Sequence, residues 1–191
     1  STSVFNSPSS SGMMRGAPEA MDAFSVHSYR YPATPEATDL AGEIQHVARL
    51  AKDCGTAERV WITEIGWPTH VGPRGVDETT QARMFVRSLA QLWGTGKVER
   101  VYWYDFKNDG HQRDYNENNF GVVWHQDYNW APKPAAVAAA VFARLTAGGT
   151  SPQVWQDGEA YGLRLDLPGQ WKVLVAWSAG EPVPVRIQGT K

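Results

Sequence analysis

Several classes of protein are excluded by what this chain lacks. It has one cysteine in 191 residues, Cys54, so no disulfide can form within the chain. Its 18 lysines and arginines against 20 acidic residues form no basic run or stripe, so we predict neither nucleic acid nor an anionic membrane surface as a partner. No apolar run approaches the roughly 18 residues that span a bilayer. These absences leave a globular chain with room for one sizeable core.

Sequence signals for metals, cofactors and targeting are also missing. The five histidines show no i,i+4 or short-gap spacing typical of metal ligands, so we predict no metal site and no cofactor. The sequence has no glycine-rich phosphate loop and no nucleophile elbow. No signal peptide is visible, and the chain begins with Ser1 rather than Met, so we expect a fragment or a processed product. The compartment stays open.

The order of elements is predicted from apolar runs, caps and breakers. Short β-branched strands are expected at residues 22–28, 59–63 and 98–104. Helices are expected after each strand, with Thr34, Asp77 and Pro134 near their starts. Strands and helices alternating at this spacing predict βαβ units and a parallel sheet. Residues 1–20 are expected to form a loop with a short strand at the start.

The pattern changes after Gly149. Four short strands are expected, at residues 153–156, 159–167, 172–178 and 183–187, with turn residues between them. This predicts a small antiparallel β module and a domain boundary that separates residues 1–149 from residues 150–191.

Polar side chains follow each of the three predicted strands. They are His27 and Tyr29 after the first, Glu64 after the second and Asp105 after the third. In (β/α)8 enzymes these strand ends form the active site, and the interior of a parallel sheet rejects charge. We therefore predict Glu64 as a nucleophile that attacks an anomeric carbon. The alternative is a carboxylate satisfied by loop amides or a surface arginine.

Further residues are predicted to contact a sugar. Nine tryptophans are many for a chain of this size, and flat indole faces suit pyranose rings as well as cores. Trp103 is expected to form the floor of a subsite, with core packing as the alternative. Trp67 and His70 are expected as wall residues, with loop-fixing contacts as the alternative. Tyr104 and Asp105 point to opposite faces of their strand, so only one of the two need face the site.

Three motifs resemble those of clan A glycoside hydrolases, especially bacterial family 39-like and cellulase-like members. They are DAFSVHSY at residues 22–29, WITEIGWPT at residues 61–69 and VYWYDF at residues 101–106. The resemblance implies an α/β fold that is a partial (half) TIM barrel of three to four βα units, equivalent to strands six to eight. Residues 1–3 would be a remnant of strand five. The trailing module resembles a truncated accessory β-sandwich.

The chain departs from that family in its second carboxyl group. The resemblance implies a general acid that is a Glu after Asn at the end of the fourth strand, and no such pair follows a strand here. A retaining mechanism needs two carboxyls about 5–5.5 Å apart. A weak acid could be Asp105, Glu117 or Glu19.

Three accounts of the chain stay open. It is a retaining glycosidase completed by a complementing barrel half on another polypeptide. It self-associates as a homodimer that covers open strand edges and apolar faces. Or it is a catalytically silent carbohydrate-binding or scaffold remnant. In each case the predicted ligand is a carbohydrate.

Overall fold

The protein alternates strands and helices before ending in a second sheet. A computed structural model describes residues 21–186. The first half contains β1 (Phe24–His27), α2 (Leu40–Asp53), β2 (Val60–Ile65), α3 (Glu78–Gly94), β3 (Val98–Trp103) and α4 (Pro134–Thr146). The strand predicted near the start, including residues 1–3, lies outside the described residues.

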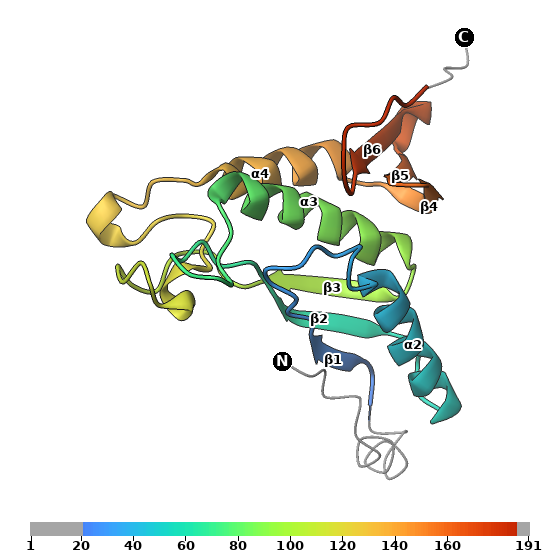
Figure 1. Ribbon diagram of the computed structural model, residues 1–191. Coiled ribbons are helices and arrows are strands. Elements are labelled where there is room, and N and C mark those ends of the chain that lie inside the picture. Colours follow the sequence, from blue (N-terminus) through green and yellow to red (C-terminus); the bar gives the residue numbers. More distant parts are fainter. Residues whose placement is uncertain (1–20, 187–191) are drawn as a thin grey trace.

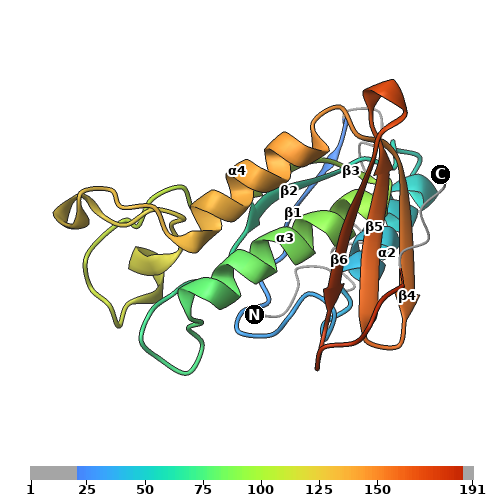
Figure 2. The ribbon, with the colours of Figure 1, turned by 90° about the horizontal axis from the view of Figure 1, so that it is seen from above.

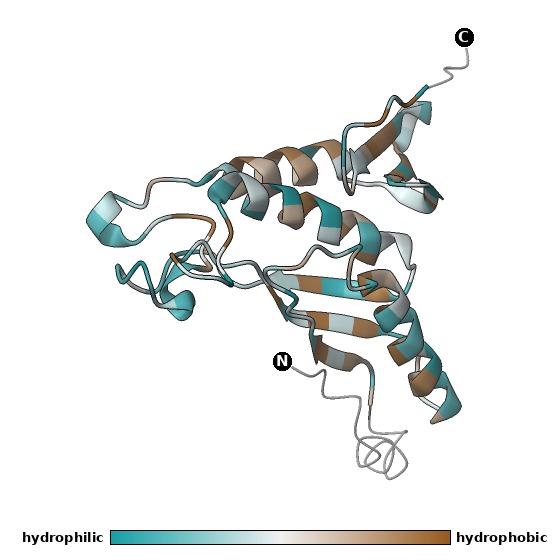
Figure 3. Ribbon diagram, viewed as in Figure 1, coloured by the Kyte–Doolittle hydropathy of each residue, from teal (hydrophilic) through white to brown (hydrophobic). Residues whose placement is uncertain are grey.

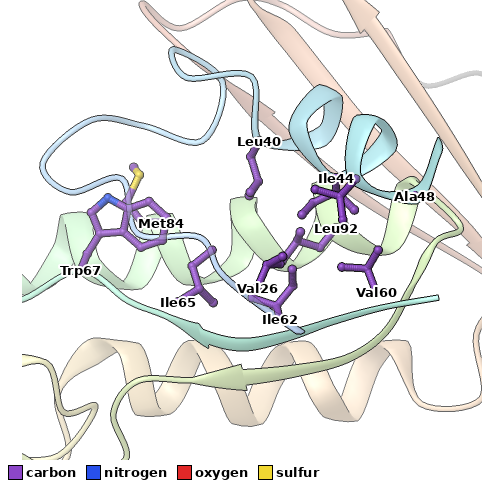
Figure 4. Packing of buried hydrophobic residues seen from close by; sticks show 11 residues of the cluster. Val26, Leu40, Ile44, Ala48, Val60, Ile62, Ile65, Trp67, Met84 and Leu92 are labelled. Atoms are coloured by element: carbon purple, nitrogen blue, oxygen red, sulfur yellow. The ribbon is translucent and has the colours of Figure 1, made fainter. Parts of the chain in front are cut away.

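The first three strands form one parallel sheet. Its order is β1-β2-β3, and both strand pairs are parallel, which confirms the predicted parallel sheet. The core lies between this sheet and the helices α2 and α3, as Figure 4 shows. Its buried members come from both layers: Val26, Leu40, Ile44, Val47, Ala48, Val60, Ile62, Ile65, Trp67, Met84 and Leu92. On β2, the buried Val60 and Ile62 alternate with the partly exposed Trp61 and Thr63, so the helices cover one face of this sheet.

The helix starts show where local signals decide the structure. The Asp77 side chain accepts a hydrogen bond from Thr80 N at 2.8 Å and caps α3, as predicted. The predicted cap Thr34 does not start α2. Its hydroxyl instead accepts from Ala37 N at 3.2 Å in a separate turn, and Asp39 caps the helix. The prediction for α2 was therefore wrong by one turn, because two successive capping signals compete in this segment.

The second sheet is antiparallel, as predicted. It consists of β4 (Thr150–Asp157), β5 (Ala160–Asp166) and β6 (Lys172–Ser178) in that order. The fourth predicted strand is wrong for the part that the structure describes, residues 183–186, which form no strand. Pro182 and Pro184 supply no N–H donors to a ladder, which accounts for the difference.

A buried carboxylate joins the second sheet to the helices. Glu36 accepts hydrogen bonds from Gln91 Nε2 at 2.7 Å and from Trp177 Nε1 at 2.6 Å, and it pairs with Arg87. Leu163 of β5 is fully buried against α3. Figures 1 and 2 show this sheet at one end of the molecule and the long loop after β3 at the other.

One helix keeps an apolar face open to solvent. On α4, Val137, Val141 and Leu145 are about half exposed, and Figure 3 shows the apolar character along this helix. Their spacing of four residues places them on one stripe.

Among the described residues, no helix combines the length and the apolarity that a bilayer crossing requires.

Candidate active site at the carboxyl ends of the parallel strands

Glu64 lies where β2 ends. The strand pairing shifts register near this point, between Val26 and His27 on β1 and between Ile62 and Ile65 on β2. Such irregularities at strand ends re-aim side chains. The Glu64 side chain is 35% exposed, so its carboxylate can meet a ligand from solvent.

Two side chains from the neighbouring strand end hold this carboxylate. Tyr29 Oη donates a hydrogen bond to Glu64 Oε2 at 2.8 Å, and His27 Nδ1 lies 3.3 Å from the same oxygen. The backbone supports the arrangement, because Ser28 N donates to the Glu64 carbonyl at 3.0 Å. The fold thus brings together three of the predicted site residues, His27, Tyr29 and Glu64.

An aromatic cluster surrounds the Tyr29 ring. Tyr31, Tyr104 and Phe120 have ring centroids 5.9, 6.2 and 5.6 Å from it. Burial and the hydrogen-bonded Glu64 carboxylate raise the pKa of Tyr29 above its usual value. Burial, with nearby carboxylates, raises the pKa of Tyr104 to about 12. Both phenols therefore keep their protons near neutral pH and can act as donors.

Further carboxylates lie beside Tyr104. Asp105 and Glu117 both act on the Tyr104 hydroxyl electrostatically. The Glu117 carboxylate accepts from Asn116 Nδ2 at 2.7 Å. Burial, together with the charge of Asp109, raises the pKa of Asp105. A carboxyl whose pKa is raised keeps its proton closer to neutral pH, which is the protonation state that a general acid needs.

The structure places Trp67 and Trp103 in the core rather than against a ligand. Trp67 is fully buried and its Nε1 donates to Ala33 O at 2.9 Å. Trp103 stacks on Trp67 with ring centroids 5.9 Å apart and packs against Phe85 at 4.6 Å. The expected roles as wall and floor are therefore corrected, because the indole faces are covered by protein. Tyr104 instead lies in the aromatic cluster around Tyr29.

His70 lies beside Tyr31. It lines a pocket of about 370 Å³ together with Tyr31 and Arg74. Burial and the Arg74 charge lower the pKa of His70, so it is neutral near pH 7. The guanidinium of Arg74 stacks on the Tyr31 ring at 4.4 Å. None of these contacts joins His70 to Glu64.

A buried lysine, which the sequence analysis did not single out, connects the loops near the site through hydrogen bonds. Lys133 Nζ donates to Thr69 Oγ1 and Asn108 Oδ1, both at 2.9 Å, and to Asn119 O at 3.3 Å. Burial lowers the pKa of Lys133 to about 8. These bonds connect the loops that follow β2 and β3. A charged residue just before a helix gave no signal of burial, so the sequence could not reveal this role.

One group outside this site could hold a metal ion. His111, His125 and Asp127 offer ligand atoms that all lie within 4.8 Å of one another. The histidines are far apart in sequence, so their spacing gave no sign of a cluster.

Comparisons with known proteins identify the relatives of the chain. The family model of the glycosyl hydrolase catalytic core matches residues 13–121. No curated protein sequence matches the chain. A solved family 39 glycoside hydrolase from the gut symbiont Bacteroides cellulosilyticus WH2 is 26% identical, with a TM-score of 0.69, over 86% of this chain and 35% of that one.

A second solved structure, a β-glycosidase, is 16% identical with a TM-score of 0.52, over 75% of this chain and 38% of that one, and shows the fold alone. The chain thus spans little more than a third of the length of either structure.

Proposed function

The chain belongs to the glycosyl hydrolase catalytic core family, and from that premise we propose that it supplies the nucleophile of a retaining glycoside hydrolase. Glu64 is that nucleophile. The observation that supports this is the partly exposed Glu64 carboxylate at a strand end, held by Tyr29 Oη at 2.8 Å. A phenol that binds one oxygen fixes the carboxylate plane and leaves the other oxygen for attack.

The proposed reaction has two steps at one carboxylate. Glu64 attacks the anomeric carbon and forms a glycosyl-enzyme while an acid protonates the leaving oxygen. Water then attacks the same carbon, gives its proton to the conjugate base of that acid, and releases Glu64. Tyr29 and His27 stabilise the Glu64 carboxylate when hydrolysis of the glycosyl-enzyme releases it, because both side chains can donate a hydrogen bond to Oε2.

The proton donor is the open part of this proposal. Within the chain, Asp105 is the best candidate, because burial raises its pKa. Glu117 is the second, since its charge reaches Tyr29 and Tyr104. A carboxyl from outside the chain is the third source. The distance of the true donor from Glu64 should be near 5–5.5 Å for retention.

A complementing barrel half is the proposed partner. Among the described residues, β1 and β3 each pair only with β2, so the parallel sheet has two open edges. Such edges favour pairing with further strands, and α4 adds the exposed stripe of Val137, Val141 and Leu145. Light scattering decides the matter, since a stable homodimer would assign this surface to a second copy instead.

The test of the nucleophile compares wild type with Glu64→Gln on aryl β-glycosides. We expect the variant to lose at least about 1,000-fold in kcat/KM, because an amide cannot form the glycosyl-enzyme. An activated 2-fluoro-glycoside should label Glu64, as read by peptide mass spectrometry. The matched control is Glu58→Gln, a partly exposed carboxylate paired with lysines. Equal rates in wild type and Glu64→Gln, or a label on another residue, would overturn the proposal.

A carbohydrate-binding remnant is the second candidate. The observation in its favour is the aromatic cluster of Tyr31, Tyr104 and Phe120 around Tyr29, beside Glu64. It predicts saccharide binding by calorimetry that Tyr104→Ala weakens, with no turnover at any pH and no covalent label on Glu64.

A further inference from the structure

We propose that His111, His125 and Asp127 form a binding site for a divalent transition-metal ion, with Zn²⁺ as the ion that fits. The site lies in the long loop after β3 and does not depend on the role of Glu64. Two imidazoles and one carboxylate are a ligand set that zinc accepts.

The spacing of the ligand atoms suits tetrahedral zinc. His125 Nδ1 lies 3.2 Å from Asp127 Oδ2, and His111 Nδ1 lies 3.6 Å from the same oxygen. Zinc bonds of about 2.0–2.1 Å at tetrahedral angles place neighbouring ligands roughly 3.3 Å apart. Two edges of the triangle thus have the required length, and the third is no longer than 4.8 Å. A small side-chain rotation closes it.

Two polar groups of Asp127 lie close to the same nitrogen of His125. Asp127 N donates to His125 Nδ1 at 3.3 Å, and Asp127 Oδ2 lies 3.2 Å from the same nitrogen. In the tautomer that accepts from Asp127 N, this nitrogen and the carboxylate oxygen are both acceptors, and two acceptors at this distance repel unless a cation lies between them. A metal ion bound to all three ligands removes the repulsion.

The position of the cluster gives the ion a structural task. His111 comes from the first arm of the loop, and His125 and Asp127 come from the second arm, where a short 3-10 helix spans Gln126–Tyr128. Lys107 and Val123 bridge the arms at their base, and Arg113 stacks on Trp124 at 4.4 Å. A metal ion would add a third tie between the arms.

Access and coordination number also fit. The side chains of His111 and Asp127 are more than half exposed, whereas that of His125 is 16% exposed. One anchored ligand and two reachable ligands allow an ion to enter from solvent. The open side leaves the fourth position to water, so the site is of the three-ligand type.

The test is calorimetric titration of the full chain with ZnCl₂ at pH 7.5, with Co²⁺ absorption as a second readout. We expect one ion per chain and the visible bands of tetrahedral cobalt. His111→Ala and Asp127→Asn should each raise Kd at least about tenfold, and His125→Ala should abolish saturable binding. Circular dichroism establishes that each variant is folded.

Two controls separate this site from other metal-binding groups. His46→Ala removes an exposed histidine of α2, and Cys54→Ser removes the thiol. Both should leave Kd unchanged. Absence of saturable Zn²⁺ binding, or equal affinity in wild type, His111→Ala and Asp127→Asn, would overturn the assignment whatever the outcome for Glu64.

Discussion

At the scale of single residues, the candidate site is built from hydrogen bonds between neighbouring strand ends. The sequence predicted that His27, Tyr29 and Glu64 lie together, because the carboxyl ends of parallel strands meet at one edge. It could not predict which aromatic ring would face them. Trp103 and Tyr104 are adjacent in the chain, and the choice between them depends on the core position that Trp67 and Phe85 create for an indole.

The buried lysine yields a prediction about stability and pH. Lys133→Met should cost roughly 2–3 kcal/mol, because Thr69, Asn108 and Asn119 lose their shared donor. The pKa of Lys133 falls from its usual 10.5 to about 8 in the folded protein. Between these values the unfolded chain holds a proton that the folded chain has released, so raising the pH favours folding.

The advantage of wild type over Lys133→Met should therefore grow, on the order of 2 kcal/mol, between pH 8 and pH 10.5. Urea unfolding at a series of pH values measures it. Lys52→Met, whose side chain is 70% exposed, is the control and should show no such trend. A constant difference across this range would contradict the prediction.

At the scale of elements, capping distinguishes the helix start that was predicted from the one that was not. Asp77 has a single plausible role, since an extended segment precedes it and a helix follows. In the segment before α2, Thr34 and Asp39 each have capping chemistry. The local sequence cannot rank two such signals, and the packing of Leu40 in the core decides between them.

Asp77→Ala should lower the free energy of unfolding by about 1 kcal/mol, because Thr80 N loses its acceptor at the start of α3. Hydrogen bonds from Thr80 lower the pKa of Asp77. The stabilisation is thus present near neutral pH and is lost as the pH falls through the folded pKa.

Chemical denaturation at pH 7 and pH 3 measures both effects. The control is Asp53→Ala. Asp53 is the last residue of α2, and a carboxylate at a helix C-terminus interacts unfavourably with the helix dipole, so its removal should not lower the free energy of unfolding. A cost for Asp77→Ala that is the same at pH 3 as at pH 7 would contradict the argument.

At the scale of the whole molecule, the second sheet is joined to the rest of the fold through contacts that the local sequence does not predict. The sequence predicted a parallel sheet, a small antiparallel module and a change of pattern after Gly149. It did not predict how the two meet. Glu36 and Trp177 are 141 residues apart, and neither periodicity nor a motif relates them. The loop cluster of His111 and Asp127 escaped prediction for the same reason.

Glu36→Gln should destabilise the protein by about 3 kcal/mol, because Arg87 is left as a buried charge without its partner. We also expect faster proteolytic cleavage between α4 and β4 as the second sheet loses a tie to the helices. Thermal unfolding and limited proteolysis report the two effects.

The matched control for this carboxylate is Glu58→Gln. It removes a more exposed carboxylate bound to Lys52 and Lys97 and should cost much less than Glu36→Gln, because ion pairs screened by solvent contribute little to stability. Similar costs for the two variants would show that the Glu36 contacts do not hold the sheets together.

The adjacency of β1 and β2 has a consequence for how such a chain can be inherited. Glu64, Tyr29 and His27 lie within 38 residues of one another on neighbouring strands. Any genetic exchange that moves this stretch carries the carboxylate together with both of its hydrogen-bonding companions. A residue on a distant strand would be inherited separately, whereas the contacts of Glu64 with Tyr29 and His27 would be inherited together.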